Sequence, residues 1–192
     1  MDSAMQNQRD SPLLRMPPEI RNCIYDFALG GNTFVLLKDD DTEQIVNKTK
    51  SKNALALLAV CRQLYAETAL LPFSLNVFSS VSPSRLHSWA SAIRPVHRNN
   101  ITALKLVTCF FKVSTDFEVC SHYFGKPKDW IFSELPSLRH IHLRIVLFNY
   151  TKNTEKDVRA RFSVHGELLE HLLAASSKEV KVGTTWEYML LN

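Results

Sequence analysis

Glycine, cysteine and long apolar runs are all scarce in this sequence of 192 residues. Only five glycines occur, so the chain contains neither a glycine-rich loop for phosphates nor a dinucleotide-binding fingerprint. The Gly-x-Ser-x-Gly elbow of serine hydrolases and the His-Glu-x-x-His helix of zinc proteases are also missing. We therefore expect a protein that is not an enzyme, with no cofactor and no small-molecule ligand.

The sequence also lacks a run of eighteen apolar residues, and its first ten residues lack the apolar segment of a secretory signal. We expect an intracellular protein, cytoplasmic or nuclear, that has no membrane partner. The net charge of +4 is spread along the chain, whereas nucleic-acid binders concentrate basic residues on one face. Association with nucleic acid is therefore only a weaker alternative function.

The cysteines are four and widely spaced, at Cys23, Cys61, Cys109 and Cys120. Apolar or aromatic residues stand near each of them, which in a chain without an export signal favours buried, reduced thiols over disulfides. Cys120 and His122 are close enough to share a metal ion, but a structural zinc site requires a second such pair. We therefore expect no metal site.

The order of apolar patterns predicts an α+β domain, in which helices pack on a small sheet. Residues 1–11 are polar and are expected to form a flexible tail. Residues 12–80 are expected to form a region of helices with an inserted hairpin. Residues 81–192 are expected to form an α/β region that packs on it, so that the two regions make one compact unit.

Two helices and a hairpin are predicted in the first region. The first helix begins at Pro17-Pro18-Glu19 and ends at Gly30-Gly31, with an apolar face of Ile20, Ile24, Phe27 and Ala28. Strand patterns at Thr33–Leu37 and Glu43–Asn47 predict the hairpin. The second helix is predicted over Ala54–Leu71, ending before Pro72, with a stripe formed by Leu57, Val60, Cys61, Leu64 and Thr68.

The second region is predicted to contain one repeated pattern and three further elements. Residues 101–108 and 135–145 share an apolar residue, a gap of three and then alternation, about 37 residues apart, which predicts two related strands. A helix with Leu86, Trp89 and Ile93 on one face precedes them. Another helix is predicted over Val164–Ala175, and a last strand over Lys181–Leu190.

The segment SPLLRMPPEIRNCIYDFALG, residues 11–30, resembles the opening of F-box domains, where a Leu-Pro-Glu lead begins an amphipathic helix. With LLAVCRQLYAETALLPFSLNVF over Leu57–Phe78, it resembles more closely the F-box-like domain of a group of uncharacterised fungal proteins. The resemblance covers Leu13–Phe78 and implies that residues 12–80 form an F-box-like region. The later segment LPSLRHIHLRI is similar to leucine-rich elements that often follow F-box domains.

This resemblance implies a protein-interaction module that binds a Skp-type adaptor and serves as a substrate receptor in ubiquitin ligation. The residues that match the adaptor contact are Leu13, Leu14, Met16, Pro17, Ile20 and Ile24. Alternatively, these residues pack on the predicted second helix. The chain would then be a structural or regulatory scaffold that binds no adaptor.

Four charged residues are expected to fix how the two helices dock. Arg62 and Glu67 of the second helix would pair with Glu19 and Arg21 of the first, because arginine forms multidentate pairs with carboxylates. In the alternative interpretation, Arg62 and Glu67 contact a partner protein instead.

The two related strands predict a binding face. Side chains alternate along a strand, so His142 and Arg144 point away from the side that carries Leu143. If the strands are parallel neighbours, Lys105, His142 and Arg144 form a basic stripe. Repeat proteins bind partners on such faces, so an acidic peptide or protein patch is the predicted ligand, and an ordinary solvated strand face is the alternative.

Overall fold

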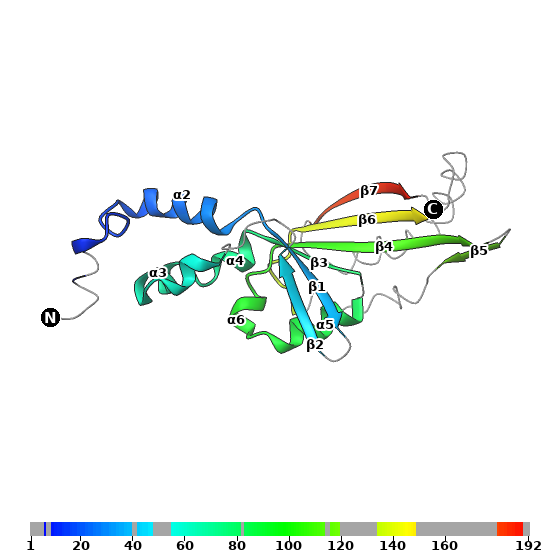
Figure 1. Cartoon of the computed structure of the whole chain (residues 1–192), viewed down its shortest axis with the longest axis horizontal. Helices are drawn as coiled ribbons and strands as arrows, with labels where there is room; N and C mark the ends of the chain where they lie inside the picture. The colour runs from blue at the N-terminus through cyan, green and yellow to red at the C-terminus, as the bar shows by residue number, and fades with distance from the viewer. Residues whose placement is uncertain are drawn as a thin grey trace.

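The computed structural model describes the following parts of the chain, which include a mixed sheet and a set of short helices: residues 6, 9–39, 42–47, 55–81, 83–113, 116–119, 134–148 and 180–189. Figure 1 shows the sheet extending toward one end of an elongated molecule, with helices projecting from its other end. The α+β class predicted from the sequence is confirmed. The predicted helix at Val164–Ala175 lies outside the described residues.

A seven-stranded sheet forms the body of the described chain. Its strands are β1 (Thr33–Asp39), β2 (Thr42–Asn47), β3 (Val77–Ser80), β4 (Ala103–Val113), β5 (Asp116–Val119), β6 (His140–Phe148) and β7 (Lys181–Met189). Six strands lie in the order β2-β1-β3-β4-β6-β7, and β5 pairs with the far end of β4. Neighbours along β1-β3-β4-β6-β7 are parallel, whereas β2 and β5 are antiparallel to their partners. The sheet therefore takes strands from both predicted regions.

Beside the sheet, the described part of the chain contains the helical segments α2 (Pro18–Leu29), η1 (Ala56–Ala59), α3 (Arg62–Thr68), α4 (Leu71–Ser74), α5 (Pro83–Ala92) and α6 (Pro95–Arg98). α2, η1 and α3 form what we call the helical arm, and Figure 1 shows it projecting from the end of the sheet. α5 instead packs against β1 and β3. In the part of the chain that the structure describes, no helix is both long and apolar enough to cross a membrane.

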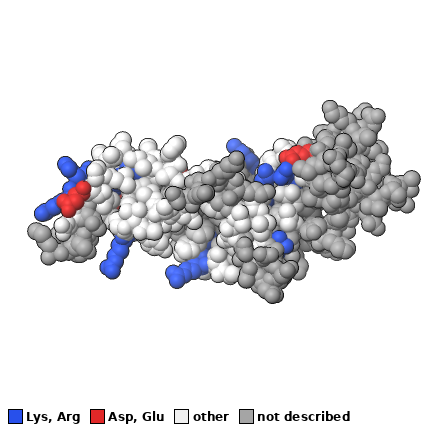
Figure 2. All heavy atoms as spheres, viewed as in Figure 1, with Lys and Arg blue, Asp and Glu red and all other residues white. Residues whose placement is uncertain are grey.

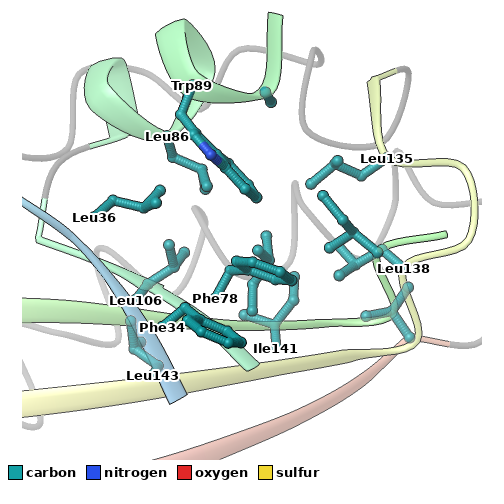
Figure 3. Packing of buried hydrophobic residues seen from close by; sticks show 14 residues of the cluster. Phe34, Leu36, Phe78, Leu86, Trp89, Leu106, Leu135, Leu138, Ile141 and Leu143 are labelled. Atoms are coloured by element: carbon teal, nitrogen blue, oxygen red, sulfur yellow. The ribbon is translucent and has the colours of Figure 1, made fainter. Parts of the chain in front are cut away.

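The main core lies between α5 and the sheet. Figure 3 shows Trp89 of α5 reaching down to Phe78 of β3, whose ring also stacks on Phe34. The ring centroids are 4.8 Å and 5.7 Å from that of Phe78. Burying each large apolar side chain contributes about 1.5–3 kcal/mol, so this cluster is the largest source of stability among the described contacts.

The repeated sequence pattern corresponds to β4 and β6, which are parallel neighbours. Leu104 lies opposite Ile141 and Leu106 opposite Leu143, a separation of 37 residues along the chain. All four side chains are buried in the main core. The repeat therefore places equivalent leucine-type residues side by side on one face of the sheet.

The helical arm has a smaller core of its own, and here α2 is rotated relative to the predicted apolar face. Tyr25 and Leu29 are fully buried against Leu64 of α3, whereas Ile20 and Phe27 are exposed. The apolar face noted in the sequence, with Ile20 and Phe27, is therefore not the face that packs inside the arm. α2 carries two apolar stripes, and helical periodicity alone does not decide which of them faces the partner helix.

The predicted single helix over Ala54–Leu71 is also wrong, because the chain breaks at Cys61. Cys61 has the extended values φ −159° and ψ 166°, so η1 ends before it and α3 begins after it. Both pieces pack on the same arm core, which is why their apolar spacing resembles one helix. Pro72 lies in the first turn of α4, where a missing N–H donor costs nothing.

The glycine pair after α2 allows a tight turn into the sheet. A Cβ atom at Gly30 would lie 2.6 Å from the carbonyl oxygen of Asp26, a distance that real structures avoid. Gly31 has φ 73°, the left-handed conformation that favours glycine. The left-handed residue is therefore Gly31 rather than Gly30, whose backbone is extended.

Two buried asparagines join the arm to the sheet, and we call them the asparagine junction. Asn76 Nδ2 donates to the carbonyl oxygens of Leu29 and Pro72, at 2.7 Å and 2.9 Å, and its Oδ1 accepts from the backbone N–H of Asn32 at 2.7 Å. Asn32 Nδ2 in turn donates to the carbonyl of Gly30 at 3.0 Å. Both asparagines are buried, so these groups depend on one another for hydrogen bonds.

The asparagine junction predicts a strong effect of a nearly isosteric substitution. Asn76→Asp removes the donor to two carbonyl oxygens and places a carboxylate beside them, so we expect a loss of roughly 3 kcal/mol in unfolding free energy. Chemical denaturation monitored by circular dichroism measures it. The control is Asn99→Asp, at an exposed asparagine, which should leave the stability nearly unchanged. Equal stability of wild type and Asn76→Asp would contradict this role.

Candidate functional site

Glu67 of α3 is the centre of a polar cluster that joins the two helices of the arm. It accepts two hydrogen bonds from Arg21, through Nε at 3.1 Å and Nη2 at 3.0 Å. The hydroxyl of Tyr25 donates to Glu67 at 2.8 Å, and the side-chain amide of Gln63 at 3.0 Å. Arg21 Nη1 also donates to the carbonyl of Met16 at 2.9 Å, which holds the segment before α2. This cluster fixes α2 against α3.

The cluster shifts two pKa values in opposite directions. Burial acts to raise the pKa of Glu67, but hydrogen bonds from Gln63, Tyr25 and Arg21, with the Arg21 charge, outweigh it and lower that pKa. Burial raises the pKa of Tyr25, and its hydrogen bond to Glu67 adds to the effect. The folded arm therefore favours an ionised Glu67 and a neutral Tyr25.

The structure brings together only one of the two expected charged pairs. Arg21 and Glu67 form a bidentate ion pair, whose atoms Nη2 and Oε1 are 3.0 Å apart. Glu19 and Arg62 are both exposed, and no ion pair joins them within the described residues. Sequence reasoning missed Tyr25 and Gln63, although each lies four residues from a member of the pair, on the same helix face.

The residues matched to the adaptor contact divide into buried and exposed groups. Leu14 is buried in the arm core and Leu13 packs against it. Met16 is 37% exposed and Ile20 is 50% exposed, and Pro17 is also exposed. Ile24 is half-buried, and Phe27, which the resemblance did not single out, is 90% exposed.

Ile20, Ile24 and Phe27 are spaced by four and then three residues, so they share one face of α2. We call them, with Met16, the apolar stripe. Tyr25 and Leu29 lie on a different face of the same helix, which packs inside the arm. Figure 2 shows a broad uncharged surface over the arm, with charged atoms toward its free end.

The expected basic residues lie on neighbouring strands, on the side of the sheet away from the main core. Lys105 of β4 lies opposite His142 of β6, and Arg144 lies two residues further along β6. His142 Nε2 is 2.7 Å from the hydroxyl of Thr185 on β7. The strand register therefore brings Lys105, His142 and Arg144 onto one face.

Sequence reasoning missed an acid on this same face. Both guanidinium nitrogens Nε and Nη2 of Arg144 donate to the carboxylate of Glu187 on β7, the first at 2.8 Å. The hydrogen bond from Arg144 lowers the pKa of Glu187 against a small effect of burial, and the charges of Arg144 and Lys105 lower it further. Only the β6–β7 pairing reveals this contact, because 43 residues separate the two partners.

The two cysteines of the arm differ in burial. Cys23 is exposed on α2, so its predicted burial was wrong, whereas Cys61 is half-buried in the arm. Cys120 and His122 lie outside the described residues. Elsewhere, in the residues that the structure places, no group of three potential ligands could hold a metal ion.

The pKa of Glu67 predicts how stability depends on pH. Because folding lowers this pKa from 4.5, the cluster's contribution is complete above pH 4.5 and is lost as the pH falls through the lower, folded-state value. Glu67→Gln should lower the Tm by about 2–4 °C at pH 7, and this difference from wild type should shrink below pH 4.5.

Thermal melts of wild type and Glu67→Gln between pH 3 and 7 provide the measurement. Glu19→Gln removes the same charge at an exposed position of α2 and serves as the matched control. A difference between wild type and Glu67→Gln that stays constant across this range would show that ionised Glu67 does not stabilise the arm.

Comparison with known proteins places the sheet within a family. A family model described as a domain of unknown function (DUF7730) matches residues 38–184, which run from the end of β1 into β7. No curated protein and no solved structure matches the chain. Because the match spans more than half of the 192 residues, this chain belongs to the DUF7730 family.

Proposed function

We propose that the chain is a protein-interaction module whose helical arm binds a Skp-type adaptor, as a substrate receptor in ubiquitin ligation. The observation that supports this proposal is the exposure of the apolar stripe, above all that of Ile20 and Phe27. Contiguous exposed apolar side chains mark protein-interaction sites on soluble proteins.

α2 has more apolar surface than its own fold uses. Its inner face packs through Tyr25 and Leu29, while the stripe on another face remains open. An apolar helix face normally packs against another element. The described residues pack on only one side of α2. A partner protein would therefore cover the apolar stripe on the other side.

The arm holds the stripe in a fixed orientation before any partner binds. Glu67 fixes the rotation of α2 through Arg21 and Tyr25, and the asparagine junction fixes the end of α2 to the sheet. Because a preorganised surface loses little conformational entropy on binding, a modest apolar stripe suffices for specific docking.

A Skp-type adaptor is the partner implied by the resemblance to F-box domains. Met16, Pro17, Ile20 and Ile24 match the F-box contact and are at least partly exposed. Leu13 and Leu14 match as well, but they pack in the arm core and would support the contact from behind. Phe27 extends the contact surface by one more turn of α2.

The proposal predicts that a charge in the apolar stripe weakens adaptor binding. Ile20→Asp and Phe27→Asp should each weaken the affinity of the full chain for a purified Skp-type adaptor by about tenfold or more, which corresponds to roughly 1.4 kcal/mol. Isothermal titration calorimetry measures the affinities, and thermal melts verify that each variant folds.

Val96→Asp is the matched control, because Val96 is 51% exposed on α6, outside the arm. It should bind the adaptor like the wild type. If the wild-type chain binds no Skp-type adaptor, the adaptor proposal fails and a scaffold without adaptor contact takes its place. If all three variants bind equally, the stripe is not the contact.

A further inference from the structure

The sheet has a second surface, formed by the side chains of β4, β6 and β7 that point away from the main core. Alternate residues of each strand contribute to this surface, which we call the outer face. His140 and Lys181 lie opposite each other at the start of β6 and β7, and both are exposed. Val146, further along β6, is buried, so the open part lies toward the strand starts.

The outer face is basic over this open part. Lys105, Arg144 and Lys181 contribute three positive charges, and His140 and His142 lie among them. Glu187 is the only acid at the outer positions of these three strands, within the part that the structure describes. Neighbouring strands are about 4.8 Å apart, so the cationic groups lie within reach of a single extended peptide.

Glu187 shows that a carboxylate fits this surface. Arg144 donates to both of its oxygens, and the charge of Lys105 also acts on it. Bidentate arginine–carboxylate pairs are strong and directional. The outer face therefore already binds one carboxylate, which the chain itself supplies.

Gly183 of β7 lies opposite His142 on this face of the sheet. A Cβ atom added at Gly183 would lie 3.3 Å from His142 Nδ1, so a side chain there would crowd the imidazole. Glycine at this position therefore leaves room for the imidazole of His142 against β7. Thr185, which contacts the other ring nitrogen, is exposed as well.

We propose that the outer face binds an acidic peptide segment, and that Glu187 is an internal competitor that holds Arg144 until a ligand carboxylate replaces it. Lys105 and Lys181 attract the segment, and the exposed Thr185, which contacts His142, lies on the same face. This inference goes beyond adaptor binding, because it concerns a different surface and a different ligand. In a substrate receptor, such a surface would recognise the substrate.

Fluorescence anisotropy with a labelled peptide of alternating glutamate and serine tests the proposal on the full chain. The matched peptide carries glutamine at each glutamate position. We expect binding of the glutamate peptide alone, with an affinity that falls as salt is added, because exposed charges are screened. Lys105→Glu and Lys181→Glu should each weaken binding by about tenfold, while Glu187→Gln should tighten it about threefold.

Arg62→Glu is the control variant, since it makes the same charge change at an exposed position of α3. Its affinity for the glutamate peptide should equal that of the wild type. Equal binding of both peptides, or an equal loss in Arg62→Glu, would overturn the acidic-peptide proposal. Unchanged affinity in Glu187→Gln would overturn the role of Glu187 as competitor.

Two further measurements separate this inference from its alternatives. In the first, single-stranded RNA and unlabelled peptide compete with the labelled peptide. If the RNA displaces it at a lower concentration than the unlabelled peptide does, the outer face is a nucleic-acid site and the proposal is overturned. In the second, the affinity of Lys105→Glu and Lys181→Glu for the adaptor should equal that of the wild type. The peptide-binding proposal and the adaptor-binding proposal can then be overturned separately. Circular dichroism confirms folding of each variant, and Lys181→Glu, at an exposed position, guards against a misfolded Lys105→Glu.

Discussion

The buried side-chain amide of Asn76 forms hydrogen bonds with three backbone groups. Its Oδ1 accepts a hydrogen bond from the backbone N–H of Asn32. Its Nδ2 donates to the last carbonyl of α2 and to a carbonyl of α4. An unpaired buried group of this kind costs about 1–3 kcal/mol, so the end of α2, α4 and the approach to β1 are held to one arrangement. The direction of the arm, and with it every surface that the arm presents, depends on this arrangement.

Rotation of α2 about its own axis is a separate constraint, which Glu67 supplies. With Arg21 and Tyr25 both bonded to this carboxylate, Tyr25 and Leu29 are turned inward and Ile20 and Phe27 outward. Apolar burial is non-directional, and both faces of α2 carry large apolar side chains, so burial alone does not select this rotation. The directional hydrogen bonds of a charged group make the choice, and the proposed adaptor surface follows from it.

Features of the fold that follow from local periodicity could be predicted from the sequence. Features that arise from contacts between residues far apart in the chain could not. Spacing of 37 residues predicted that Leu104 and Ile141 occupy equivalent strand positions, and the parallel pairing of β4 and β6 confirms it. Spacing did not reveal the break at Cys61, because one extended residue leaves the apolar pattern nearly intact. Spacing marked the apolar face with Ile20 and Phe27 but did not reveal that Tyr25 and Leu29 form the inner face of α2. Glu187 was missed because its partner Arg144 is 43 residues away.

A substrate receptor of the proposed kind must hold its ligand at a fixed position relative to the adaptor. A short connection joins α2 of the arm to β1, and another joins α4 to β3. These two connections link the proposed adaptor surface to the sheet that carries the outer face. The asparagine junction ties both connections together. A flexible linker would spread the two surfaces over many separations and lower the effective concentration of one at the other. The buried amides of Asn32 and Asn76 are therefore a functional requirement of the proposal as well as a structural one.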